Sequence, residues 1–323
     1  MSATVPTIDL RGPAGTVAEA LDAAATRVGF FQVVGHDVDP ATIDAAWAAA
    51  TALFDLPLAD KLAVRIPPGD AYGYAPFRAE RLAASRGGDT PPDLKETFSV
   101  GPFDPPAPGV IEADPAAAFV YSPNRWPIGV AGLEHAWEAY YRDMAALARR
   151  VLALMARSLG LPATHFEPFV DRHTSALRAL RYPDLGGAPP EPGQLRAGAH
   201  SDYGTLTLLR QDDAPGGLEV RGTDGAWHPV PAVPDAFVVN VGDALERWSN
   251  DRWRSTLHRV VVPPHGAGRD CTRQSLAFFH NANWDAVIEC LPTCTDAEHP
   301  PRYPPVTAGT HLMDKFRATQ GPA

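Results

Sequence analysis

The sequence is poor in cysteine, has no long apolar run and carries no excess of positive charge. Its three cysteines among 323 residues are too few and uneven in number for a disulfide framework, so we expect a reducing, cytoplasmic location. No segment approaches the roughly 18 apolar residues of a membrane span. Residues 1–10 lack the basic and apolar segments of a secretory signal. The net charge of −10 leaves no basic face for phosphate groups, so we expect no nucleic-acid partner. Because no apolar segment is long enough to span a membrane, we expect no membrane partner.

The composition is that of a globular protein with a substantial core. Hydrophobic residues make up 45% of the chain and charged residues 20%. A chain of this length could form one large domain or two small ones. We expect an N-terminal region, residues 1–130, and a second region, residues 131–323, packed as one compact unit. No pattern in the sequence specifies an oligomeric state.

The N-terminal part alternates strand and helix signals. Residues 4–10 and 30–34 are expected to form short strands. Thr16 and Glu19 fit a capping box at the start of one helix, and Asp39 precedes the proline that starts the next. Farther on, residues 133–159 carry apolar side chains at helical spacing and predict the longest helix of the chain.

The second half of the chain favours short strands separated by glycine, proline and aspartate. Such a succession is typical of a sandwich, a barrel or a jelly roll. Together with the helices it predicts an α+β protein. The expected strands are residues 176–182, 196–200, 204–210, 217–221, 227–230, 236–241, 257–262 and 273–280.

Three residues in this half have the pattern of a metal site. His200 and Asp202 are two positions apart in an extended segment, so their side chains point to the same face. His258 begins a later β-branched run and supplies a possible third ligand. Two histidines and one carboxylate on one face, with the opposite positions open, suit non-haem Fe(II) and O2 chemistry. We therefore expect His200, Asp202 and His258 to be both metal ligands and catalytic residues.

A second constellation follows on the last expected strand. Arg273 and Ser275 share one face of an otherwise apolar segment. A buried guanidinium needs an anionic partner, and its planar fork matches a carboxylate. The neighbouring sequence offers no such partner, so a ligand carboxylate is the expected one.

The order of these residues resembles the iron- and 2-oxoglutarate-dependent dioxygenases, in particular the isopenicillin N synthase-like family. The resemblance consists of H-x-D at His200, a histidine at His258 and R-x-S at Arg273. It extends over residues 5–315 through further matching segments: 5–10, 29–36, 93–98, 180–183 and 240–243.

The resemblance implies a fold, cosubstrates and residue roles. It implies a double-stranded β-helix core, a distorted jelly roll, with an N-terminal α/β region and scaffold helices. Fe(II) would use 2-oxoglutarate and O2 as cosubstrates, with Arg273 and Ser275 binding the distal carboxylate of 2-oxoglutarate and Tyr182 donating a hydrogen bond nearby. Leu180 stands where many plant members carry asparagine, so that polar contact is expected to be missing. Asp202 favours oxygenation or desaturation over halogenation, because family halogenases replace this carboxylate with a small residue.

Residues 64–130 are proline-rich and weakly periodic, yet they contain several aromatic residues. Long irregular segments in compact chains are commonly functional, so we expect substrate-facing loops here, with Tyr74, Phe77 and Phe98 as candidate substrate contacts. Arg178 is a further candidate, for a substrate carboxylate. Lys95 and Glu96 are expected to form a solvated or structural ion pair.

The function expected is oxidation, by hydroxylation or desaturation, of a small molecule in specialised metabolism, with 2-oxoglutarate converted to succinate and CO2. Two alternatives remain open. One is an oxidase of the isopenicillin N synthase type, which uses iron and O2 without 2-oxoglutarate; Gln320 near the C-terminus resembles the tail glutamine of that enzyme. The other is a non-catalytic small-molecule binding protein on the same fold.

Overall fold

The computed structural model describes residues 5–86, 90–263 and 271–320, and its largest element is an eight-stranded sheet. The strand order is β1–β2–β10–β7–β12–β5–β4–β3, and only the β1–β2 pair is parallel. The N-terminal strands therefore continue the sheet formed by the second half of the chain. The strands are β1 (Thr7–Asp9), β2 (Phe30–Val34), β3 (Gly73–Ala75), β4 (Glu96–Val100), β5 (Ala176–Tyr182), β7 (Leu206–Gln211), β10 (Phe237–Val241) and β12 (Arg273–His280).

A smaller, four-stranded sheet faces the large one. Its order is β6–β11–β8–β9, and all of its pairs are antiparallel. The two sheets form the jelly-roll core, which confirms the predicted fold class. The strands are β6 (Ala197–His200), β8 (Leu218–Arg221), β9 (Trp227–Pro229) and β11 (His258–Val260), and a separate pair consists of β13 (Val287–Ile288) and β14 (Val306–Thr307).

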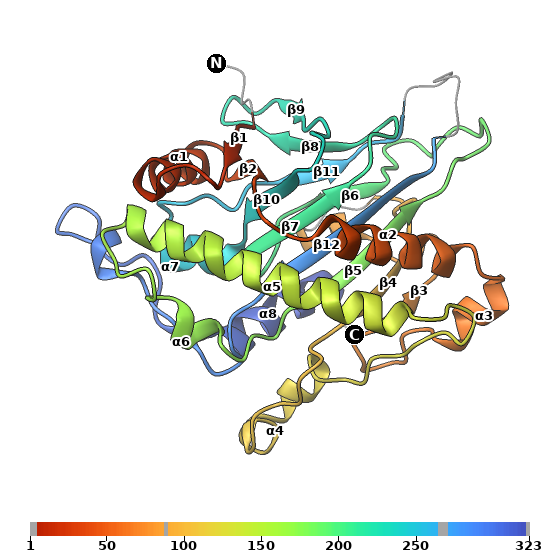
Figure 1. Cartoon of the computed structure of the whole chain (residues 1–323), viewed down its shortest axis with the longest axis horizontal. Coiled ribbons are helices and arrows are strands. Elements are labelled where there is room, and N and C mark those ends of the chain that lie inside the picture. The colour runs from red at the N-terminus through yellow and green to blue at the C-terminus, as the bar shows by residue number, and fades with distance from the viewer. Residues whose placement is uncertain (1–4, 87–89, 264–270, 321–323) are drawn as a thin grey trace.

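Three helices cover the outer face of the large sheet, and the longest, α5, runs across it (Figure 1). They are α1 (Ala14–Arg27), α2 (Pro40–Phe54) and α5 (Leu133–Ser158). Shorter elements complete the chain: α3 (Leu58–Ala63), η1 (Leu82–Arg86), α4 (Val110–Ala113), η2 (Pro115–Phe119), α6 (Glu167–Val170), α7 (Asp243–Trp248), η3 (Pro292–Cys294) and α8 (Ala308–Gln320). Of the helices in the described residues, none combines the length and the apolar character that a membrane crossing requires.

Alternation along the strands separates an outer from an inner face. Leu177 and Ala179 of β5 belong to the core cluster that includes the apolar face of α5. Leu180 and Tyr182 of the same strand belong to a second cluster, which also contains Val260 of the small sheet. The inner face of the large sheet therefore looks toward the small sheet, and functional side chains are expected between the two.

Two helix starts can be compared with the sequence analysis. The helix α2 begins at Pro40 as predicted, and Asp39 caps it, because its carboxylate accepts a hydrogen bond from the backbone N–H of Ala41 at 2.9 Å. The capping box at Thr16 is wrong. The helix α1 begins at Ala14 behind Pro13, with no side-chain cap, so Thr16 already lies within its first turn.

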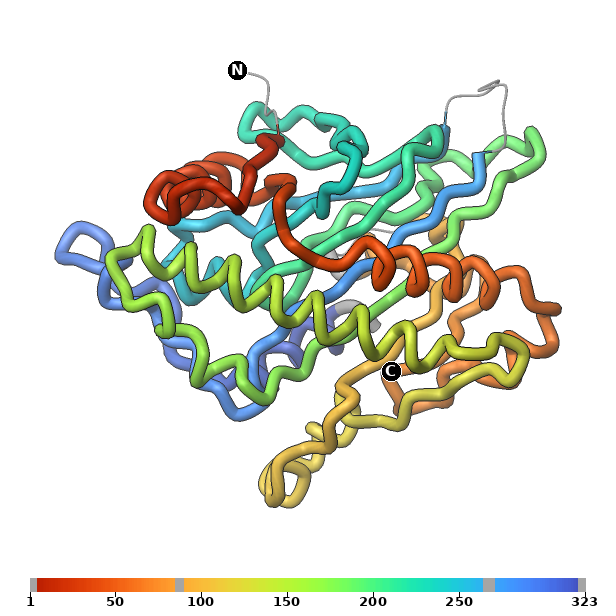
Figure 2. The backbone as a smooth tube through the Cα atoms, in the orientation of Figure 1, coloured from red at the N-terminus to blue at the C-terminus, as the bar shows by residue number. Residues whose placement is uncertain are grey.

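The proline-rich segment contains more regular structure than the sequence indicates. Its strands β3 and β4 extend the large sheet at one edge. The chain around α4 and η2, coloured yellow, projects from the lower edge of the molecule in the view of Figure 2.

Two aromatic residues predicted to contact substrate lie in the hydrophobic core. Phe98 is fully buried, with its ring centroid 5.3 Å from that of Trp137 on α5. Tyr74 is 1% exposed and donates its hydroxyl hydrogen bond to Glu96. Both side chains point to the helix-covered face, because alternation along β3 and β4 places them there. Phe77, in contrast, is 41% exposed.

We predict that Phe98→Ala lowers the free energy of unfolding by about 3–5 kcal/mol, because it removes a fully buried ring and leaves a cavity. Chemical denaturation followed by circular dichroism measures this change. The matched control is Phe77→Ala at the exposed position, for which we expect a change within about 0.5 kcal/mol. Equal losses in the two variants would contradict the placement of Phe98 in the core.

Candidate metal centre and cosubstrate site

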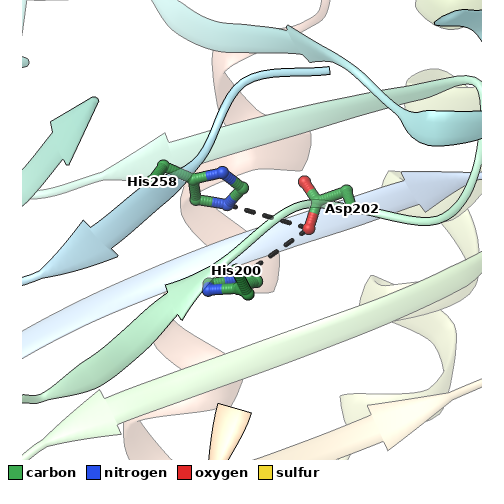
Figure 3. A group of neighbouring side chains, drawn as sticks. All are labelled: His200, Asp202 and His258. Carbon is green, nitrogen blue, oxygen red and sulfur yellow. Dashed lines mark ion pairs between the residues drawn. The ribbon is translucent and has the colours of Figure 1, made fainter. Parts of the chain in front are cut away.

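The three predicted metal ligands meet between the two sheets. His200 is the last residue of β6, and His258 is the first residue of the neighbouring strand β11. The antiparallel register pairs these two residues directly, so their ring centroids lie 4.3 Å apart. Asp202 follows β6 by two residues, and its carboxylate points toward both imidazoles (Figure 3).

One atom of each side chain faces a common point. The Oδ1 atom of Asp202 lies 3.9 Å from Nε2 of His200 and 3.7 Å from Nε2 of His258. The three possible ligand atoms all lie within 4.8 Å of one another. This spacing is typical of side chains that share one metal ion.

The backbone sets the tautomer of both histidines. Nδ1 of His200 lies 2.7 Å from the carbonyl oxygen of Gly198, and Nδ1 of His258 lies 3.1 Å from that of Thr256. A carbonyl oxygen only accepts hydrogen bonds, so each Nδ1 carries the proton and each Nε2 keeps its lone pair for a metal. Burial, and next the neighbouring His258, lower the pKa of His200 to about 3, so this imidazole is neutral at pH 7.

Two donors from the large sheet hold the carboxylate of Asp202. Its Oδ2 atom accepts hydrogen bonds from the Thr207 hydroxyl at 2.6 Å and from the Asn240 amide at 2.7 Å. Burial raises the pKa of Asp202, but the two imidazoles and these two hydrogen bonds outweigh it and lower the pKa overall. The carboxylate is therefore ionised, with Oδ1 left to face the histidines.

The residues present fit an Fe(II) ion. Two imidazoles and one carboxylate form the donor set of the two-histidine, one-carboxylate facial triad. The remaining atoms of all three side chains are engaged by the protein, which is the outer-shell support that ligating groups require.

The predicted carboxylate-binding residues lie on the inner face of the large sheet. The guanidinium of Arg273 is buried; its Nη2 donates to the Gln211 side chain at 2.8 Å and its Nη1 to the Ser275 hydroxyl at 3.5 Å. Asp212 approaches its Nε only to 4.0 Å and is the nearest carboxylate among the ion pairs of the described residues. The positive charge of Arg273 is thus poorly compensated within the protein.

A second buried arginine lies beside this one. The guanidinium carbons of Arg196 and Arg273 lie 5.9 Å and 5.1 Å from the ring centroid of Tyr182. Arg196 is held by backbone carbonyl oxygens, those of Pro215 and Cys271. Burial, and next Arg273, lower the pKa of Arg196. Two buried guanidinium groups around one tyrosine make a strongly anion-attracting site.

Sequence reasoning missed four residues of this assembly: Thr207, Asn240, Gln211 and Arg196. The first two leave a detectable signal, since each is a polar residue between apolar ones in a strand, as in Leu-Thr-Leu and Val-Asn-Val. Such a residue points to the opposite face from its neighbours. Gln211 and Arg196 lie near strand ends and offer no comparable signal.

Other predicted residues are dispersed. Lys95 and Glu96 do not pair with each other. Lys95, directly before β4, pairs with Asp93 and Glu80, and Glu96, the first residue of β4, pairs with Lys61. Both are buried rather than solvated. Arg178 shares the inner face of β5 with Tyr182. Gln320 ends α8, and its side chain lies outside the described part of the structure.

Two family models match this chain. Residues 5–128 match the model of the non-haem dioxygenase N-terminal region, named after morphine synthesis, and residues 174–282 match that of the 2OG-Fe(II) oxygenase superfamily. The second match contains the two histidines, the aspartate and the R-x-S residues.

Several similar proteins are named as oxidising enzymes, and one of them is named for 2-oxoglutarate and Fe(II). A 2-oxoglutarate-Fe(II) type oxidoreductase of Emericella nidulans is 33% identical over 91% of this chain and 82% of its own length. Gibberellin 20 oxidase 2 of Oryza sativa subsp. indica is 36% identical over 91% of this chain and 70% of its own length. A proline hydroxylase of Petromyces alliaceus is 33% identical over 88% of this chain and 86% of its own length.

Solved structures agree. T7H of Neurospora crassa, in complex with α-ketoglutarate and thymine, superimposes with a TM-score of 0.83 at 31% identity, covering 98% of this chain and 97% of that one. A putative 2OG-Fe(II) oxygenase of Caulobacter crescentus gives 0.82 at 34% identity, covering 97% and 98%. The reading as an oxidase without 2-oxoglutarate is not favoured, because the similar proteins are 2-oxoglutarate enzymes. The chain belongs to the 2-oxoglutarate- and Fe(II)-dependent oxygenase superfamily and is an oxidoreductase that uses Fe(II) as its cofactor and 2-oxoglutarate as a cosubstrate.

Proposed function

We propose that His200, Asp202 and His258 hold Fe(II), and that Arg273, Ser275 and Tyr182 bind 2-oxoglutarate. The observation that carries this proposal is the orientation of the three candidate ligands. Each presents one free ligand atom to a common point while its other polar atom is engaged by the protein. A purely structural role for these residues would not explain why three ligand atoms face one another.

Bound Fe(II) with 2-oxoglutarate supplies the activation of O2, and the 2-oxoglutarate is converted to succinate and CO2. The protein residues supply position and charge. Asp202 stays ionised and fixed between Thr207 and Asn240, so it contributes negative charge without moving. His200 and His258 each direct Nδ1 to a backbone carbonyl oxygen, which orients the ring and leaves Nε2 facing the metal position.

The distal carboxylate of 2-oxoglutarate would lie against the guanidinium of Arg273. That group donates hydrogen bonds to Gln211 and Ser275, and its central carbon lies 5.1 Å from the ring centroid of Tyr182. The nearby Arg196 adds a second positive charge. Such a fixed anchor would orient the cosubstrate before the reaction.

The proposed substrate is a small molecule of specialised metabolism, which is hydroxylated or desaturated. The printed names of similar proteins support this class, since they include a proline hydroxylase, gibberellin 20 oxidases and a thymine complex. A cytoplasmic location is proposed as well, because Cys271, Cys290 and Cys294 are all free thiols. The net charge of −10 supports a role without nucleic acid.

Thr207→Val is predicted to weaken metal binding about 10- to 100-fold, because it removes a hydrogen bond that fixes the carboxylate of Asp202. The affinity is measured anaerobically by titrating Fe(II) against a competing chelator. Thr51→Val is the matched control, since the Thr51 hydroxyl bonds Trp47 and Gln274, away from the triad. Unchanged affinity in Thr207→Val would contradict the role of Asp202 as a ligand.

Arg273→Met is predicted to raise the dissociation constant of 2-oxoglutarate about 10- to 100-fold, because it removes a charge-assisted contact to a carboxylate. Calorimetric titration of the anaerobic Fe(II) protein with 2-oxoglutarate measures the change, and the affinity for Fe(II) is expected to survive. Arg142→Met on the exposed side of α5 serves as the control. If both variants bind 2-oxoglutarate as the unaltered protein does, the assignment of Arg273 is lost.

A further inference from the structure

Arg178 is a charged residue on the inner face of β5, and it forms an ion pair with Glu80. Arg178 lies four residues from Tyr182 on the same face, about 13 Å along the strand at the usual rise per residue. The register places Tyr182 opposite Arg273 but Arg178 opposite Ala277. Arg178 is therefore displaced along the sheet from the residues proposed to bind 2-oxoglutarate.

Arg178 is partly accessible although its strand is interior. The strand β5 lies between β4 and β12, and the side chain of Arg178 is 25% exposed. Nε donates to the Ser99 hydroxyl at 2.8 Å, and Nη1 donates to Oε1 of Glu80 at 3.3 Å. Nη2 donates to no acceptor in the described part of the chain. One nitrogen of a fixed guanidinium on the inner face of the sheet is thus left to bind an acceptor from a ligand.

Glu80 offers the complementary group. Its Oε2 atom is buried and accepts no hydrogen bond, although Nζ of Lys95 lies 3.2 Å away. Burial raises the pKa of Glu80, but Arg178 and then Lys95 outweigh it and bring the pKa to about 2. The carboxylate is therefore ionised, with Oε1 paired with Arg178 and Oε2 paired with Lys95.

Backbone contacts place Glu80 beside the strand that carries the metal ligands. Its carbonyl oxygen accepts the N–H of Asp93 at 2.9 Å, and Oδ1 of Asp93 accepts the N–H of Gly198 at 2.9 Å. Gly198 is two residues before His200 on β6. The loop that bears Glu80 is therefore tied to the edge of the candidate metal centre.

A further polar atom on the same wall lacks a partner. The Thr97 hydroxyl is buried and has no hydrogen bond. Thr97 pairs with Leu180 on β5, and it faces inward because its neighbour Phe98 faces the helices. Buried polar groups without partners are uncommon, and an absent ligand is one explanation for the unpaired hydroxyl of Thr97.

We infer that Glu80 and Arg178 form the substrate-recognition pair, and that the substrate presents an N–H donor beside an oxygen acceptor. The donor meets the carboxylate of Glu80, whose side chain is 24% exposed, and the acceptor meets Nη2 of Arg178. A cyclic amide or imide has this arrangement, and so does an α-amino acid. The inference rests on the proposed function, because it assumes that the space beside the triad holds the substrate.

A site of this kind discriminates strongly. A pocket whose buried polar groups must be paired rejects analogues that lack the matching groups far better than an apolar pocket rejects a change of size. Loss of one charge-assisted hydrogen bond corresponds to about tenfold or more in affinity.

The test uses two matched pairs of small probes on the anaerobic Fe(II) protein saturated with 2-oxoglutarate. Glutarimide is compared with N-methylglutarimide, which lacks the N–H, and L-norleucine with hexanoate, which lacks the ammonium group. Calorimetric titration gives the four dissociation constants. We expect at least one parent probe to bind about tenfold or more tightly than its blocked analogue, and the pair that responds identifies the substrate class. Absence of a preference in both pairs overturns the inference.

Variants assign the preference to the pair of residues. Glu80→Gln and Arg178→Met are expected to abolish the discrimination. Arg181→Met is the matched control on the same strand, since Arg181 points to the opposite face and pairs with Asp55; it should retain the discrimination. Arg178→Lys keeps the charge without the fork and covers the case in which Arg178→Met does not fold. A preference that survives in Glu80→Gln and in a folded Arg178 variant contradicts the inference.

The dissociation constant of 2-oxoglutarate, measured in the same samples, separates two kinds of failure. If the unaltered protein does not bind 2-oxoglutarate, the proposed function is wrong, and this inference, which rests on it, is wrong as well. If 2-oxoglutarate binds and neither probe pair discriminates, the recognition pair alone is wrong.

Discussion

The site depends on the position of the Asp202 carboxylate, whose two oxygen atoms have different partners. Oδ2 is fixed by Thr207 and Asn240 from two adjacent strands of the large sheet. Oδ1 faces His200 and His258, which come from two adjacent strands of the small sheet. One carboxylate thus joins the two layers of the jelly roll, and its position is set only when both sheets are correctly paired.

The separation of inner and outer faces explains how one fold holds both a core and a polar cavity. Outward side chains of the large sheet pack against α1, α2 and α5 and supply most of the apolar burial. That leaves the inward positions available for polar residues, each of which must find a partner. Within the described residues, Gln32 and Thr97 are inward residues whose buried polar atoms have no hydrogen-bond partner.

The sequence predicted what depends on local spacing. The strands of the second half, the helix α5 and the grouping of His200, Asp202 and His258 follow from alternation and periodicity, and the structure contains them. Residues that depend on pairing between distant segments were not predictable in this way. Asn240 reaches Asp202 only because β10 pairs with β7, and Glu80 reaches Arg178 across 98 positions of sequence. The substrate contacts expected at Tyr74 and Phe98 illustrate the same limit, since their face is decided by how β3 and β4 join the sheet.

The central claim is that this triad and arginine cluster bind Fe(II) and 2-oxoglutarate together, and it can be tested without knowing the substrate. The protein is loaded with Fe(II) without oxygen, 2-oxoglutarate is added, and visible absorption is recorded before and after O2 is admitted. The account predicts a weak charge-transfer band that requires both additions, followed by succinate formed from the 2-oxoglutarate consumed. A protein shown to hold iron that gives neither the band nor succinate would contradict the account.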